Sequence, residues 1–94
     1  MNRMELISLT QAIAGILRAF GEPTGADWLD VRTARLQSAT SDEEVREIGS
    51  ELHGIVLGMG GLTDLFLDDV DGRDGSAATT QLRSLADRLY QVTK

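Results

Sequence analysis

The chain has 94 residues, of which 41% are hydrophobic, enough for one modest core and too few for two. Fifteen Asp and Glu against nine Lys and Arg give a formal net charge of −6, which repels nucleic-acid phosphates and anionic membranes. The absence of cysteine excludes disulfides and thiolate chemistry. The longest nearly apolar run, residues 55–62, is too short to cross a bilayer. We therefore expect a single cytoplasmic domain, residues 1–94, that binds neither nucleic acid nor membrane.

The hydrophobic pattern predicts helices from the start of the chain. Apolar residues recur at helical spacing over about residues 3–20, and Gly21 followed by Pro23 ends this helix. The apolar positions are Leu6, Leu9, Ile13, Ile16, Leu17 and Phe20. Thr24 or Asp27 can cap a second helix, which ends in the segment 38–41. Its apolar residues are Trp28, Leu29, Val31 and Leu36.

Two further helices follow the same logic. Ser41 and Glu44 match a capping box, and they begin a helix over about residues 42–57. A heptad-like seam lies along it, formed by Val45, Ile48, Leu52, Ile55 and Met59. Ser76 or Thr79 can begin the last helix, whose seam is Leu82, Leu85, Leu89 and Val92. The predicted fold is an all-α bundle of three to four helices.

The segment between these two helices is irregular. The cluster Gly58-Met59-Gly60-Gly61 cannot sustain a helix and predicts a sharp turn or a close backbone approach. Residues 62–67 fit either a short helix begun by Thr63 or an extended segment laid across the bundle. We therefore expect a glycine-rich irregular element at about residues 58–67.

An acidic loop, residues 68–75, invites a comparison with calcium-binding loops. An EF-hand loop needs oxygen ligands at positions 1 and 12 when glycine stands at position 6. Placing Gly72 or Gly75 at position 6 leaves apolar or amide residues at those two positions. The sequence therefore predicts an exposed acidic connector without a metal ion, formed by Asp68, Asp69, Asp71 and Asp74.

Other candidate chemistry is weak. The glycine cluster lacks the third glycine of a dinucleotide-binding fingerprint and the lysine of a P-loop, so no cofactor is predicted. His53 is the only histidine, and we expect it at the edge of the core with one hydrogen-bond partner. Glutamates at 44, 47 and 51 share one helix face, which is typical of a solvated surface. Trp28 is the only tryptophan, and it fits either a core anchor or a half-exposed interface anchor.

One pattern resembles a known group. Trp28 followed some thirty residues later by Gly58-Met59-Gly60-Gly61-Leu-Thr-Asp64-Leu is similar to small bacterial proteins of unknown function with a Gly-Met-Gly-Ser core. This chain has Gly61 where that group tends to have Ser. The resemblance implies a small helical domain without catalytic activity, in which these residues form the distinctive local structure. On physical grounds, Asp64 is placed to accept hydrogen bonds from backbone N–H groups that the glycine turn leaves without helical partners.

The functional prediction is non-enzymatic binding of a protein partner. The specific form is an immunity or inhibitor protein that blocks a bacterial toxin. In that form Asp68, Asp69, Asp71 and Asp74 face a basic cleft of the toxin, where charge complementarity speeds association. Two alternatives stay open at this point: a structural module that pairs with its own copy, and a small enzyme or metal-dependent hydrolase that uses Asp64, His53 and nearby carboxylates.

Overall fold

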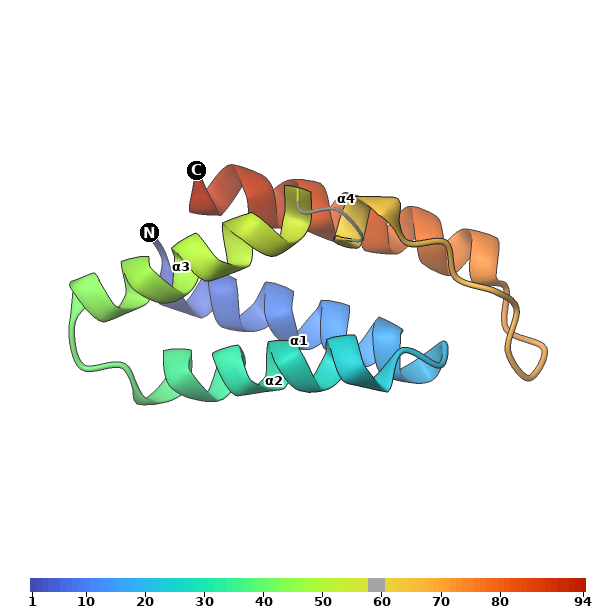
Figure 1. Ribbon diagram of the computed structural model, residues 1–94, viewed down its shortest axis with the longest axis horizontal. Coiled ribbons are helices and arrows are strands. Elements are labelled where there is room, and N and C mark those ends of the chain that lie inside the picture. The colour runs from blue at the N-terminus through green and yellow to red at the C-terminus, as the bar shows by residue number, and fades with distance from the viewer. Residues whose placement is uncertain (58–60) are drawn as a thin grey trace.

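The computed structural model describes residues 1–57 and 61–94, with the side chains of residues 57 and 63 excepted. In this part of the chain, four α-helices and a short 3-10 helix follow one another: α1 (Arg3–Ala19), α2 (Pro23–Ser38), α3 (Asp42–Leu57), η1 (Leu62–Asp64) and α4 (Gly75–Thr93). Each α-helix runs antiparallel to the one before it (Figure 1). The predicted all-α bundle is confirmed, and its four helices bear out the upper end of the expected range.

The helices form two pairs with different neighbours. α1 and α2 lie side by side along most of their length, and α4 packs on both α1 and α3 (Figure 1). α2 and α3 touch only sparsely. Because α3 ends well before the start of α4, η1 and the extended residues 65–70 lie along the remaining length of α4. Both termini lie at one end of the bundle, and the α1–α2 turn and the acidic loop lie at the other.

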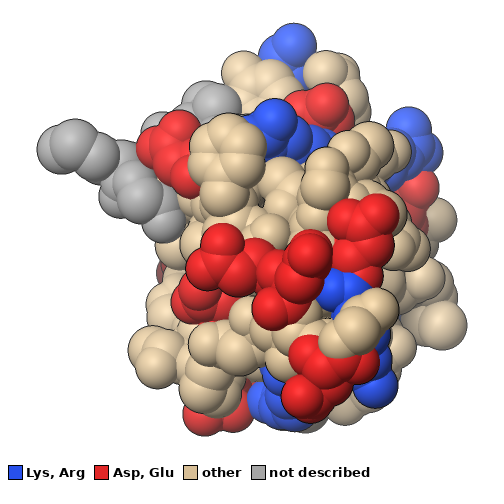
Figure 2. Space-filling view, turned by 90° about the vertical axis from the view of Figure 1, so that its right-hand side faces the viewer, with Lys and Arg blue, Asp and Glu red and all other residues tan. Residues whose placement is uncertain are grey.

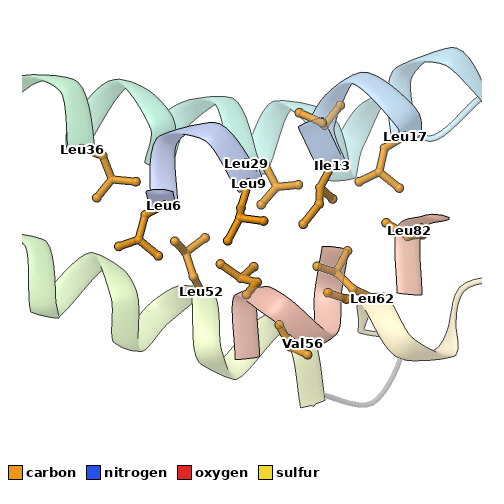
Figure 3. Close-up of a cluster of buried hydrophobic side chains, with 14 of the residues drawn as sticks. Leu6, Leu9, Ile13, Leu17, Leu29, Leu36, Leu52, Val56, Leu62 and Leu82 are labelled. Atoms are coloured by element: carbon orange, nitrogen blue, oxygen red, sulfur yellow. The ribbon is translucent and has the colours of Figure 1, made fainter. Parts of the chain in front are cut away.

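The core is built almost entirely from aliphatic side chains. Each of the four α-helices and η1 contributes at least one buried residue (Figure 3). The largest fully buried side chains are Leu6, Ile13, Leu17, Leu29, Leu36, Ile48, Leu52, Leu82, Leu89 and Val56. Burying one such side chain stabilises the fold by about 1.5–3 kcal/mol, so the hydrophobic seams of the sequence supply most of the driving force.

Polar contacts add to the α1–α2 pair. The hydroxyls of Thr10 and Thr33 are both buried and lie 2.7 Å apart between the helices. At the surface, Arg18 of α1 donates to Asp30 and to Asp27 of α2, at 2.8 and 2.9 Å. The hydrogen bonds to Asp30 and Asp27 raise the pKa of Arg18 above its usual value. Core packing and surface pairing therefore hold these two helices together along one shared interface.

The start of α2 differs from the prediction. The helix begins at Pro23, and Glu22 occupies the N-cap position without a side-chain hydrogen bond, so the predicted caps Thr24 and Asp27 are wrong. Proline suits the first helical position because its φ is preset and it has no N–H to satisfy there. Gly21 has φ +79°, the left-handed conformation expected after α1. Val31 is 54% exposed, so it lies outside the core.

The predicted capping box of α3 is confirmed on one side. The Glu44 N–H donates to the Ser41 hydroxyl at 3.2 Å, whereas the Glu44 carboxylate accepts from the N–H of Thr40, one residue before the expected partner. Along the α3 seam, Val45, Ile48 and Leu52 are buried and Ile55 is half-buried. The remaining seam residue, Met59, lies outside the described residues.

The start of α4 corrects another prediction. Asp74 is the N-cap residue, and its side chain accepts from the N–H groups of Ser76 and Ala77, so α4 begins at Gly75 and not at Ser76 or Thr79. Thr79 instead has a packing role. Its hydroxyl lies 2.9 Å from the backbone nitrogen of Leu67 and 2.7 Å from the carbonyl oxygen of Gly75. This hydroxyl anchors the extended segment 65–70 to the first turns of α4.

Candidate binding surface

His53 has a structural environment. Its Nδ1 lies 3.0 Å from the Thr93 hydroxyl, and its ring stacks on Tyr90 with 4.5 Å between the ring centres. The Thr93 hydroxyl donates its single proton within α4, with Leu89 O at 2.7 Å, so it receives the hydrogen bond from His53. This confirms the expected boundary histidine with one hydrogen-bond partner. Elsewhere in residues 1–57 and 61–94, no three His, Asp or Glu side chains are grouped as metal ligands require.

The acidic loop is a tight hairpin at the tip of the molecule. Val70 and Arg73 exchange two backbone hydrogen bonds, at 2.9 and 3.2 Å, around Asp71 and Gly72. Asp71 has φ +50° and Gly72 φ +78°, the left-handed pair that a two-residue Asp-Gly turn requires. The loop predicted as a solvated connector therefore has a defined conformation. Figure 2 views this end of the molecule and shows acidic side chains gathered on it.

The four loop aspartates divide into two pairs. Asp69 accepts the N–H of Gly75 at 2.7 Å, and Asp74 caps α4, so both of these carboxylates stabilise the fold. Asp68 and Asp71 are exposed and accept no hydrogen bond from the described residues. Of the residues proposed from sequence for partner binding, these two are left with unengaged carboxylates.

The glycine-rich motif of the sequence, residues 58–61 with Asp64, lies before the acidic loop. Gly58, Met59 and Gly60 fall outside the described residues. Gly61 is buried and extended, and its carbonyl oxygen accepts the N–H of Asp64 at 3.1 Å. Asp64 is exposed at the end of η1, and the predicted role of its side chain stays a prediction. Residues 62–64 are helical and 65–70 are extended, so each of the two alternatives for 62–67 holds for part of that segment.

An apolar pocket opens where α1, α2, α3 and η1 meet. Its volume is about 230 Å³. The lining is mostly hydrophobic and comes from five parts of the chain: Leu17, Glu22, Thr24, Gly25, Trp28, Leu29, Ile55, Gly61, Leu62 and Leu65. The pocket lies at the sparse contact between α2 and α3, close to where α3 ends and the extended segment replaces it. The bundle is therefore closed along α1–α2 and open beside η1.

Trp28 forms part of the pocket wall and is half-buried against the core, and its role as an interface anchor stays a prediction. The guanidinium of Arg32 lies 3.8 Å from the centre of its ring. Arg32 also donates to Glu51 of α3 at 3.1 Å, and Arg35 donates to the same carboxylate at 2.9 Å. These bonds, that from Arg35 above all, lower the pKa of Glu51 below its usual value of 4.5. The Trp28 indole therefore contacts an arginine that also pairs with a carboxylate of α3.

Glu22 is the one charged residue that lines the pocket. It is half-buried, and its carboxylate has no hydrogen bond or ion pair with the described residues. Neither Arg18, which pairs with Asp27 and Asp30, nor Arg32, which pairs with Glu51, forms an ion pair with Glu22. The pocket therefore combines an apolar interior with one carboxylate that has no ion pair among the described residues, while the Arg32 guanidinium lies on the Trp28 ring of its wall.

Sequence reasoning missed Glu22, because nothing in the pattern distinguishes it from other surface carboxylates. Gly25 was also missed. A Cβ at this position would lie 3.1 Å from Leu17 Cδ1, so a larger residue would press into the pocket wall. The run of small and turn-forming residues from Gly21 to Ala26 was the available signal, since it leaves the start of α2 without bulky side chains.

Comparison with known proteins supplies no relative. The chain matches no family model, no curated protein and no solved structure. Among the described residues, no helix is long and apolar enough to cross a membrane.

Proposed function

We propose that this chain is a protein-binding module whose contact surface is the half of the bundle that holds the apolar pocket and the acidic loop. The observation that carries the proposal is the pocket itself: about 230 Å³, mostly apolar, and walled by the only tryptophan. Pockets of this kind receive the anchor side chains that dominate the binding energy of protein interfaces. His53 and the glutamates of α3 have structural partners or solvated positions, so catalysis has no part in the proposal.

The charge distribution indicates what kind of partner fits. Glu22 at the pocket, Asp68 in the extended segment and Asp71 at the loop tip have no ion pair among the described residues, and the whole chain carries −6. A basic protein surface would be attracted to this end and would neutralise these carboxylates. In its specific form, the proposal is an inhibitor of the immunity-protein type that covers the basic cleft of a toxin.

A matched pair of variants tests the pocket. The tagged chain first captures its partner from a lysate of the organism that encodes it, and the affinity for the purified partner is then measured with Thr24→Tyr and Thr40→Tyr. Thr24 is exposed and lines the pocket, whereas Thr40 is exposed near the opposite end, so each variant adds the same side chain. We expect Thr24→Tyr to lower the affinity at least tenfold and Thr40→Tyr to leave it unchanged. Equal affinities, or no captured protein, would contradict the proposal.

A second pair tests the charge. Asp68→Asn with Asp71→Asn removes two charges from the acidic loop, and Glu43→Gln with Glu47→Gln removes two from the exposed face of α3. We expect only the loop pair to slow association and to flatten its dependence on salt, because steering depends on charge near the contact. Asp69 and Asp74 are left intact, since their substitution would disturb the start of α4. Equal rates for the two variants would remove the loop from the interface.

A further inference from the structure

The pocket has the size of one side chain. An apolar cavity of about 150 Å³ is large enough to bind benzene, so about 230 Å³ accommodates one aromatic ring or one branched aliphatic group with little room left. The interior walls that such a group would contact are Leu17, Leu29, Ile55, Leu62 and Leu65. This volume is too small for a helix or for an extended peptide. The part of a ligand that enters is therefore a single apolar group.

The charge at the pocket selects among apolar groups. None of the four arginines of α1 and α2 forms an ion pair with Glu22: Arg3 donates to a carbonyl oxygen, Arg18 to two aspartates, and Arg32 and Arg35 to Glu51. The Glu22 carboxylate therefore lies beside an apolar wall without a paired cation among the described residues, and the lower effective dielectric there strengthens the attraction of a cation that approaches it. An anionic group at the same position would be repelled.

From these two observations we propose that the pocket binds an apolar side chain of the partner that lies next to a positive charge. The cation then pairs with Glu22. A basic segment of a protein meets this description, with an aromatic or branched aliphatic residue beside Lys, Arg or a free N-terminal amine. This inference rests on the proposed function, because it names the chemistry of the partner at the same pocket. It also makes a prediction that needs no partner in hand.

Two small probes test the selectivity directly. 2-Phenylethylammonium and 3-phenylpropionate carry the same ring on a short chain but have opposite charges. Trp28 is the only tryptophan and lines the pocket, so its fluorescence, excited where a phenyl ring does not absorb, reports binding. We expect a saturable change with both probes and about fivefold or greater preference for the ammonium probe, the effect of one nearby charge in a partly solvated site.

The matched variants are Glu22→Gln and Glu43→Gln, which make the same change at the pocket and at a distant exposed position of α3. The side chain of Glu22 forms no hydrogen bond with the described residues, so its substitution leaves the fold intact. Glu22→Gln should reduce the preference to less than twofold, and Glu43→Gln should preserve it. No saturable change, equal affinities in the unmodified chain, or a preference that survives Glu22→Gln would each overturn the inference.

The partner-capture experiment separates this inference from the proposed function. If Thr24→Tyr weakens partner binding while Glu22→Gln does not, the pocket binds the partner without selecting for a positive charge. Only the inference then fails. If neither substitution changes partner binding while the ammonium probe still binds, the pocket's chemistry stands and the proposed protein interface fails.

Discussion

The α1–α2 pair and the α3–α4 half bury their apolar residues in different ways. α1 and α2 contact each other along nearly their whole length and join through the buried Thr10–Thr33 pair. In the other half, α3 stops at Leu57, and a 3-10 turn followed by an extended segment covers the rest of α4. The pocket lies at the border between these two arrangements. A continuous helix pair thus supplies stability, while the interrupted half leaves space for a ligand.

The largest test of this contrast compares two leucines. Leu36 of α2 is fully buried, and Leu65 is half-buried at the pocket. Leu36→Ala should lower the free energy of unfolding by about 3 kcal/mol, because it removes core contacts and leaves a cavity. Leu65→Ala should cost about 1 kcal/mol, because part of that side chain is already exposed. Chemical denaturation measures both, and equal losses would contradict the contrast.

The next test concerns the way the extended segment lies on α4. A Cβ at Gly75 would overlap the carbonyl oxygen of Leu67 and the backbone of Asp68, so Gly75→Ala should lower the free energy of unfolding by about 2 kcal/mol. Gly54 is the control, because a Cβ there meets nothing within 4 Å. Gly54→Ala should stabilise α3 by about 0.5–1 kcal/mol through helix propensity. A loss of stability in Gly54→Ala, or no loss in Gly75→Ala, would contradict the close contact between the extended segment and α4.

The sequence predicted the four helices well, because their apolar residues repeat at helical spacing and glycine or polar residues separate them. It failed at helix starts. Glu22 and Asp74 are the N-cap residues of α2 and α4, whereas residues two or five positions later were expected, since several Ser, Thr and Asp residues nearby offer equivalent caps. The pocket was beyond prediction for a different reason. It depends on where α3 stops relative to α2, a tertiary distance that no local pattern encodes.

A smaller effect is expected from the buried threonine pair. The two hydroxyls share two protons among four contacts: Leu6 O and Ile7 O beside Thr10, Leu29 O beside Thr33, and the contact between the two hydroxyls. Thr33→Val should therefore cost about 1 kcal/mol. Thr10→Val combined with Thr33→Val should cost less than the sum of the single changes, because no hydroxyl is left without its partner. Strictly additive costs in a double-mutant cycle would show that the two groups do not interact.

The smallest effect is a pH dependence at the α2–α3 contact. The hydrogen bond from Arg35, with that from Arg32, lowers the pKa of Glu51 in the folded chain below its usual value of 4.5. The stability from this carboxylate is therefore present above pH 4.5 and lost as the pH falls through the lowered pKa. Because the Glu51 side chain is 36% exposed and screened by solvent, the contribution is about 0.5 kcal/mol.

Glu51→Gln measures that contribution, with Glu47→Gln as the control at an exposed position of the same helix. The difference in unfolding free energy between the unmodified chain and Glu51→Gln should shrink between neutral pH and about pH 3. A difference that stays constant over this range would mean that the two arginines do not stabilise the ionised carboxylate.

The most direct test of the proposed interface is a map of backbone amide chemical shifts, recorded on the labelled chain with and without the captured partner. We predict that the shifts that change most belong to residues 22–29 at the start of α2 and to residues 61–71, which include η1 and the loop tip. The first turns of α3, at the opposite end, should change little. Changes concentrated in α3 or around the two termini would contradict the account, because the partner would then bind away from the pocket.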